Sequence, residues 1–259
     1  MNQTERRLYL IRSLLNEKSE YKNIAAPSDC DGQKQLLRSL VNVRLPQPID
    51  GEFLKIQDEY LKEVLEESGI TQLSDLTPIE GDLYLWQGDI TKLKCGAIVN
   101  AANTGMTGCY VPCHACIDNC IHTFAGIQLR LECAELMRKQ GCEETTGQAK
   151  ITKAYNLPCD YVIHTVGPIV DGKVTTAHEK LLTSCYRSCL TLAKQNEIDS
   201  IAFCCISTGL FHFPNERAAE IAVNTVKQYK IETGSRMKVI FNVFTDTDRE
   251  IYRRLLKTN

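Results

Sequence analysis

The sequence has no run of like charges and no long hydrophobic run. Its formal net charge is only −2 over 259 residues, so no basic tract follows a phosphate backbone, and we do not expect nucleic-acid binding. No stretch approaches the about 18 apolar residues of a membrane-spanning helix, and residues 1–7 lack the basic-then-apolar profile of a secretory signal. Repeats and low-complexity tracts are absent too. These absences predict a cytoplasmic protein without a membrane partner.

Cysteine, in contrast, is abundant. The chain has 13 cysteines, an odd number, and several lie inside apolar runs such as residues 202–206. This usage favours reduced, buried thiols over a disulfide framework, and therefore a reducing compartment. The length suits one main domain with residues left over for an appendage.

Two patterns divide the chain near residue 75. Before it, apolar residues such as Leu8, Ile11 and Leu15 recur at helical spacing. After it, short apolar segments alternate with longer amphipathic ones, so we expect strands at residues 83–86, 97–99, 161–164, 200–205 and 239–243, and helices that begin near Asp118, Thr176 and Asn215. The pattern predicts a helical N-terminal extension over residues 1–75 and an α/β domain over residues 76–259.

The densest chemistry lies in residues 108–126, which hold four cysteines, two histidines and one aspartate directly after an apolar strand. Zinc prefers thiolate and imidazole ligands. Cys109, His114 and Cys116 can supply three of them and leave a fourth position for water or substrate, as in catalytic sites. Cys113 and Cys120 are also thiols, and either one would complete a closed, structural site instead.

Four motifs follow one another along the chain, at residues 87–91, 97–103, 163–168 and 206–209. In this order they resemble the macrodomain family of ADP-ribose-binding modules, and the resemblance extends over residues 80–257. It implies a three-layer α/β/α fold with a mixed central sheet. Residues 108–122 look like the zinc-containing branch of the family, whose members remove ADP-ribose from proteins and are often encoded beside a sirtuin-type ADP-ribosyltransferase.

The resemblance also implies a binding site for ADP-ribose. Asp89 would accept a hydrogen bond from the adenine amine, although an aspartate there can simply cap a turn. Phe244 would stack on the purine, or else fill the core. Backbone N–H groups after residue 206 can converge on a diphosphate, with Gly209 allowing close approach, but His212 stands where the family pattern has glycine. The expected ligands are Asp89, Ile90, Asn103, Ser207, Thr208, Gly209, Leu210, Phe211 and Phe244.

By the same resemblance, Cys109, His114 and Cys116 hold one zinc ion per chain, and Asn103 and Asp118 are catalytic. The amide of Asn103 would orient the hydroxyls of the distal ribose, since an amide exchanges no proton at neutral pH. Asp118 would activate water or that ribose. Its structural alternative is a helix cap.

The resulting hypothesis is a zinc-dependent hydrolase of mono-ADP-ribose esterified to aspartate or glutamate of a protein. It would release free ADP-ribose and reverse a sirtuin-type transferase. Two alternatives stay open: a reader that binds ADP-ribose without turnover, and a hydrolase of O-acetyl-ADP-ribose that uses the same pocket. The role of the zinc, as a Lewis acid or as an activator of water, also stays open.

Overall fold

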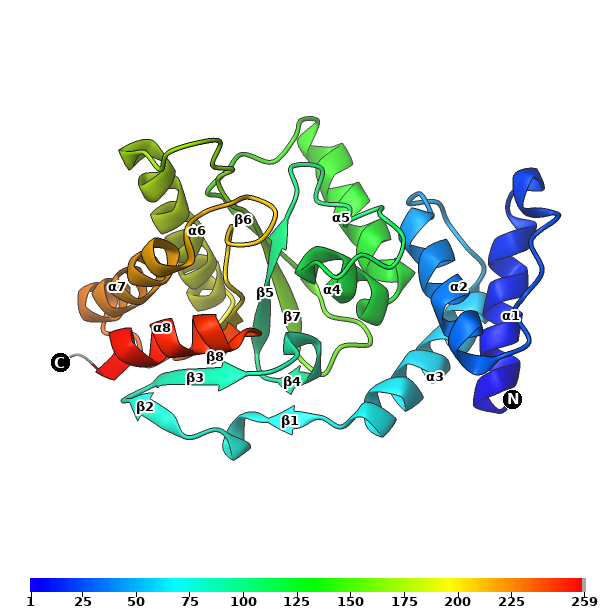
Figure 1. Ribbon diagram of the computed structural model, residues 1–259, viewed down its shortest axis with the longest axis horizontal. Helices are drawn as coiled ribbons and strands as arrows, with labels where there is room; N and C mark the ends of the chain where they lie inside the picture. The colour runs from blue at the N-terminus through cyan, green and yellow to red at the C-terminus, as the bar shows by residue number, and fades with distance from the viewer. Residues whose placement is uncertain (258–259) are drawn as a thin grey trace.

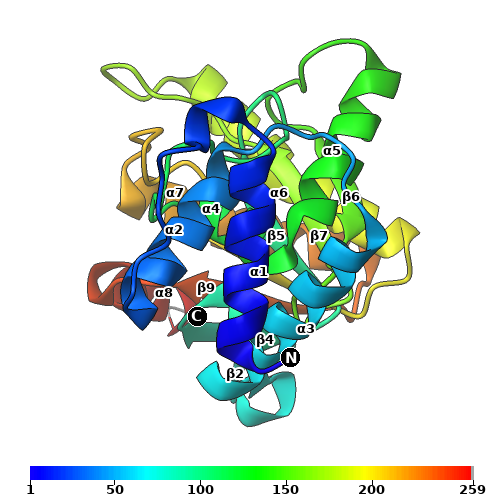
Figure 2. The same ribbon diagram turned by 90° about the vertical axis from the view of Figure 1, so that its right-hand side faces the viewer.

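Residues 1–257 are described by a computed structural model of the protein, in which the first three helices form a unit at one end of the molecule (Figure 1). They are α1 (Gln3–Asn16), α2 (Cys30–Val43) and α3 (Gly51–Ser68), with a 3-10 turn at Ser19–Tyr21. Each begins at a side-chain cap, namely Asn2, Asp29 and Asp50. Their apolar faces share a core of their own, which Ile127 of the main domain joins. Seen end-on, α1 forms the outer surface of this unit (Figure 2).

A seven-stranded sheet forms the centre of the main domain. Its order is β2 (Pro78–Glu80), β3 (Leu83–Gln87), β9 (Lys238–Val243), β8 (Ser200–Phe203), β5 (Ala97–Ala102), β7 (Tyr161–Val166) and β6 (Ala149–Lys153). The strands from β3 to β7 pair in parallel, whereas β2 and β6 are antiparallel at the two edges. The carboxyl ends of the parallel strands therefore meet at one edge, where ligands of such sheets bind.

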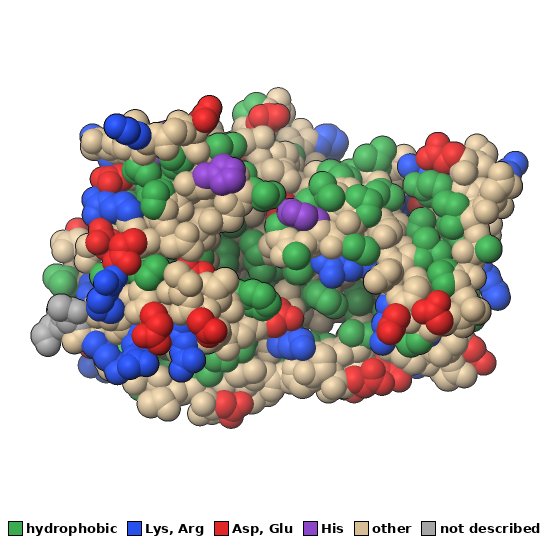
Figure 3. Space-filling model, viewed as in Figure 1, with side chains coloured by type: hydrophobic (Ala, Val, Ile, Leu, Met, Phe, Trp, Pro, Cys, Tyr) green, Lys and Arg blue, Asp and Glu red, His purple; other side chains and the backbone are tan. Residues whose placement is uncertain are grey.

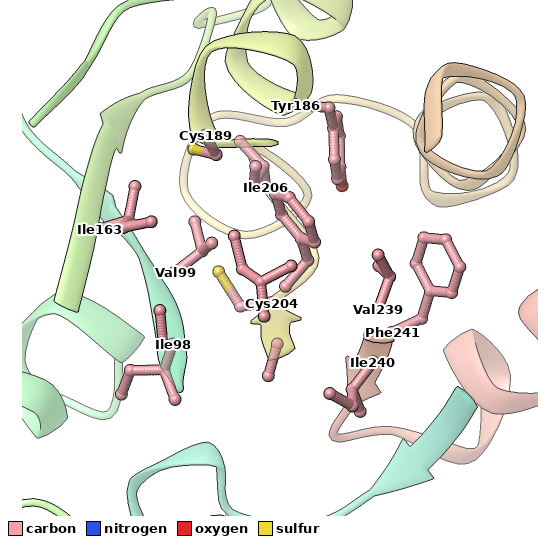
Figure 4. Close-up of a cluster of buried hydrophobic side chains, with 14 of the residues drawn as sticks. Ile98, Val99, Ile163, Tyr186, Cys189, Cys204, Ile206, Val239, Ile240 and Phe241 are labelled. Atoms are coloured by element: carbon pink, nitrogen blue, oxygen red, sulfur yellow. The ribbon is translucent and has the colours of Figure 1, made fainter. Parts of the chain in front are cut away.

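Helices cover both faces of this sheet (Figure 1). One face carries α4 (Ile117–Ala125) and α5 (Ile127–Gln140), and the other carries α6 (Thr176–Gln195), α7 (Asn215–Thr233) and α8 (Asp246–Lys257). Buried side chains of the sheet pack toward α6 in the core, as Ile163 and Cys189 illustrate (Figure 4). Phe241 of β9 lies farther along the sheet, where its ring packs against Tyr252 of α8. The three-layer fold with a mixed sheet is thereby confirmed. Within residues 1–257, no helix has both the length and the apolar character needed to cross a membrane.

Several element boundaries differ from the sequence-based ones. Strand β5 continues to Ala102, so Asn100 lies inside the strand and only Asn103 follows it, whereas β8 ends at Phe203 rather than residue 205. Helices α5 and α8 and strands β2 and β6 were not expected. A short strand β1 (Thr71–Gln72) and a 3-10 turn (Leu73–Asp75) follow α3, and β1 pairs with β4 (Leu93–Lys94) of the main domain. The chain thus joins the main domain ahead of residue 75, and the division at 75/76 stays a prediction.

Candidate active site and metal centre

Two expected adenine ligands, Asp89 and Phe244, lie at adjacent strand ends. Gly88 N donates to Val243 O at 3.1 Å, which places the residues after β3 and β9 side by side. Asp89 caps the 3-10 turn Ile90–Lys92, where its Oδ1 accepts from Thr91 N at 3.0 Å, and its Oδ2 has no partner within residues 1–257. Phe244 is 77% exposed, so it is not core filling. Its ring is free to stack on a ligand.

The helical unit borders the Asp89 side of this edge. A cavity of about 180 Å³ beside Asp89 is lined also by Leu61 and Val64 of α3 and by Phe124 of α4. Ile90 is buried, so its side chain packs in the core and holds the turn in place. Viewed as in Figure 1, the surface is hollowed near its centre, between α7 and α8 on one side and the helical unit on the other (Figure 3).

The loop after β8 presents backbone donors at the same edge. Within residues 1–257, the N–H groups of Gly209, Leu210 and Phe211 donate to no protein acceptor, and Leu210 is exposed. Thr208 Oγ1 instead turns inward to Cys205 O at 3.0 Å. Unpaired backbone N–H groups of successive residues can together bind an anion without a cationic side chain.

Ser207 shapes this loop. Its φ of 67° is left-handed, and its buried hydroxyl lies so near Gly167 that a Cβ there would come within 2.1 Å of Oγ. Any side chain at position 167 would therefore require Ser207 and Ile206 to move. At Gly209 an added Cβ would meet nothing within 4 Å, so that glycine borders open space. His212 also adopts a left-handed φ of 54°, which explains why the family pattern has glycine at this position.

Asn100, Asn103 and Asp118 form one hydrogen-bonded group between β5 and α4. Asn100 Nδ2 donates to Asp118 Oδ1 at 2.8 Å, and Asn103 Nδ2 donates to Asp118 Oδ2 at 3.2 Å and to Gly108 O at 3.1 Å. Asp118 is not the helix cap, because Cys116 occupies that position and its Sγ accepts from Asn119 N at 3.4 Å. Asn103 thus connects the candidate acid to the loop that carries the cysteines.

The pKa of the Asp118 carboxyl is raised to about 6. Burial is the main cause, and hydrogen bonds from Asn100 and Asn103 and the charge of Arg130 oppose it. A carboxyl with a pKa near neutrality can both hold and release a proton at working pH, which suits a general acid or base. His122 Nε2 lies 3.6 Å from Asp118 Oδ1, but burial lowers the pKa of that histidine well below its ordinary value. It remains neutral there.

The three expected metal ligands converge at the start of α4. One donor atom of each of Cys109, His114 and Cys116 lies within 4.8 Å of the others, and Cys109 Sγ is 3.6 Å from His114 Nδ1. A tetrahedral zinc with bonds of about 2.0–2.3 Å sets its donors roughly 3.4–3.8 Å apart. Burial raises the pKa of the Cys116 thiol to about 12, and the neighbouring Cys109 adds to this, so a metal would have to displace that proton. The donor set fits zinc.

The other thiols of the loop point elsewhere. Cys113 Sγ lies 3.2 Å from Ser39 Oγ and 3.5 Å from Gln35 O, both on α2. Cys120 Sγ accepts from Arg38 Nη2 at 3.5 Å. Within residues 1–257, neither belongs to a group of potential ligands, so the structure brings together three donors and not the four of a closed site.

Sequence reasoning missed several residues of this site. Residues 107–116 form the loop that carries the candidate metal donors, here called the metal loop. Its backbone is bound by Arg38 and Asn42 of α2 and by Arg130 of α5, and Asn119 lies fully buried beneath it. The sequence shows the helical periodicity of α2, but this periodicity does not indicate which element α2 contacts. Asn100, inside the motif at residues 97–103, donates a hydrogen bond to Asp118 and holds it in place.

Comparison with known proteins places this architecture. The Macro domain family pattern matches residues 99–222. A protein-ADP-ribose hydrolase of Treponema medium is 58% identical over 99% of this chain and 100% of that protein, and one of Staphylococcus aureus strain MRSA252 is 51% identical over 95% and 92%. A solved macrodomain of Trypanosoma brucei in complex with ADP-ribose aligns with a TM-score of 0.65 at 30% identity, covering 84% of this chain and 94% of that one. The chain therefore belongs to the macrodomain family.

Proposed function

We propose that this chain is a zinc-dependent protein-ADP-ribose hydrolase that removes mono-ADP-ribose from modified proteins. One observation carries the proposal: a loop with unpaired backbone N–H groups, a buried carboxyl with a pKa of about 6, and three converging candidate metal donors lie at one edge of the sheet. The names of the Treponema and Staphylococcus relatives, which match nearly the whole chain, support it.

In this proposal, contacts with the nucleotide end position the rest of the ligand. Asp89 Oδ2 accepts from the adenine amine while Oδ1 keeps its bonds to Thr91, and Phe244 stacks on the purine. The N–H groups of Gly209, Leu210 and Phe211 hold the diphosphate. The distal ribose then reaches Asn103, whose Oδ1 already accepts from Gly105 N at 3.0 Å and has one further lone pair for a ribose hydroxyl.

Asp118 performs the proton transfer. Its carboxylate takes a proton from the attacking water, and Asn100 and Asn103 keep both oxygens in place while it does so. Cys109, His114 and Cys116 would hold zinc, which supplies Lewis acidity to a ribose or ester oxygen or to water. We infer an ester linkage to aspartate or glutamate because a carboxylate leaves without being protonated, whereas an amine does not. A sirtuin-type transferase would supply such a substrate.

Side-by-side hydrolysis assays test the proposal. Zinc-loaded protein is given three substrates: a protein with ester-linked ADP-ribose, a protein with arginine-linked ADP-ribose, and O-acetyl-ADP-ribose. We expect release of ADP-ribose from the first, with little from the second. Binding of the first substrate without release would identify a reader, and a preference for the third would identify a metabolite hydrolase.

A further inference from the structure

Arg38 of α2 connects the helical unit to the metal loop and to α4. Arg38 Nη2 donates to His114 O at 2.8 Å and to Asn119 Oδ1 at 2.9 Å. Asn119 is fully buried, and its Nδ2 donates to Cys109 O at 3.4 Å while its backbone N–H donates to Cys116 Sγ at 3.4 Å. The pair Arg38–Asn119 therefore contacts all three candidate metal ligands.

A second set of contacts holds the tip of the loop on α2. Asn42 Oδ1 accepts from Cys113 N at 2.9 Å, and its Nδ2 donates to Thr123 Oγ1 of α4 at 2.9 Å. Cys113 has a left-handed φ of 53°. This conformation is uncommon outside glycine, and the bond to Asn42 helps to maintain it.

Arg130 fixes the position of α2 relative to the loop. Its Nη1 donates to three carbonyls at the end of α2, those of Val41, Asn42 and Arg44, at 2.9, 2.8 and 2.6 Å. Its Nε donates to Thr107 O, at the base of the loop, at 2.7 Å. One buried guanidinium thus joins the end of α2, the main domain and the loop.

We propose that α2 is part of the metal centre, and that Arg38 is a positioning residue that holds His114, Cys109 and Cys116 in the geometry that binds zinc. The inference rests on the proposed function, because it requires zinc at these three residues. Ligands on a loop gain affinity when an outer group fixes their orientation, and removal of such a group typically weakens metal binding by about 10–100-fold. The helical extension is thus required for tight metal binding, beyond its own packing.

The test compares two substitutions in the full-length protein. Arg38→Met removes the donors and keeps the bulk, and Arg12→Met, at an exposed position of α1, is the matched control. Zinc affinity is measured by competition with a chromophoric chelator, and hydrogen exchange reports on the amides of residues 109–116. We expect Arg38→Met to bind zinc about 10–100-fold more weakly with faster exchange in the loop, the control to match wild type, and ADP-ribose affinity to stay within a few-fold.

If Arg38→Met does not fold, Arg38→Lys replaces it, because lysine keeps the charge but reaches fewer acceptors, and it should also weaken zinc binding. Zinc affinity of the folded variant within about threefold of the control would overturn the role of α2 while leaving the proposed function intact. Wild-type protein that binds no zinc would overturn the metal centre itself, and this inference with it.

Discussion

Two clusters of cysteine and histidine lie near Asp118, and they differ in burial. Cys109, His114 and Cys116 are half-buried in a loop, whereas His122, Cys133 and His164 are 2%, 1% and 0% exposed in the core. Within each group, the three donor atoms lie within 4.8 Å of one another. Similar composition and spacing therefore occur in two very different surroundings.

Accessibility explains why only the loop cluster suits a metal. The donors of the loop cluster are partly exposed, whereas those of the core cluster are closed off from solvent. His164 is also engaged on both ring nitrogens, with Nδ1 3.1 Å from Asn100 Nδ2 and Nε2 2.9 Å from Thr152 Oγ1. The core cluster instead supports Asn100, which in turn holds Asp118. A metal site requires donors that an ion can reach and that are not already hydrogen-bonded to side chains outside the cluster.

The largest expected effect is on metal content. Replacing Cys109 and Cys116 together by serine should reduce zinc from about one ion per chain to nearly none, because two of three ligands are lost. The matched substitution in the core cluster, Cys133→Ser, should leave zinc unchanged. Elemental analysis of the purified proteins decides between the clusters, and full zinc in the double variant would show that our ligand assignment is wrong.

Asp118, which lies near both clusters, should control the rate of ester hydrolysis. Asp118→Asn keeps the size of the side chain but cannot ionise, so we expect ester hydrolysis to slow about 100-fold or more while ADP-ribose affinity changes only a few-fold. Single-turnover release of ADP-ribose from a modified protein, together with calorimetry, measures the two effects. An undiminished rate would assign the chemistry to another group.

Asp89 lies outside both clusters and should affect binding alone. Asp89→Ala removes one acceptor for the adenine amine, and we expect a loss of about 1.5–3 kcal/mol in ADP-ribose affinity, the range for a hydrogen bond to a charged group. Zinc content should not change. If calorimetry shows equal affinity for wild type and variant, Asp89 only caps its turn and does not bind adenine.

The smallest effect should come from the core histidine. Unfolded His164 takes up a proton near pH 6.5, but the folded ring does so only near pH 3, so acid favours the unfolded chain. Between pH 6.5 and 5, this should lower the free energy of unfolding by roughly 1–2 kcal/mol. His164→Gln should remove that part of the pH dependence in denaturant titrations of zinc-saturated protein.

Other groups also contribute to the pH dependence. The raised pKa of Asp118 has the opposite sign, because its folded form binds more protons between about pH 4 and 6. Protonation of the metal ligands also weakens the fold in acid. Both contributions are present in wild type and in His164→Gln, so the difference between the two titrations isolates His164. Identical slopes would contradict the depressed pKa of this histidine.

Helix α5 shows why some elements could not be predicted from the sequence. Ile127, Leu129, Leu131 and Cys133 alternate with polar or charged residues, which is the period of a strand, and the helix begins at Gly126 without a side-chain cap. Its helical form depends on packing against α4 and the sheet. In contrast, α7 follows Pro214 and carries apolar residues at regular helical spacing, so its start near Asn215 was predicted.

The sequence by itself determined the α/β class, the order of the binding motifs and the candidate metal donors, because these depend on local periodicity and on the chemistry of neighbouring residues. Only the tertiary structure decided that Cys113 points to α2 rather than to the metal site, that Asp118 is buried with a raised pKa, and that Arg38 holds the metal loop. These properties depend on contacts between residues far apart in the chain and on removal of water around them, and neither is encoded in the spacing of residues along a segment.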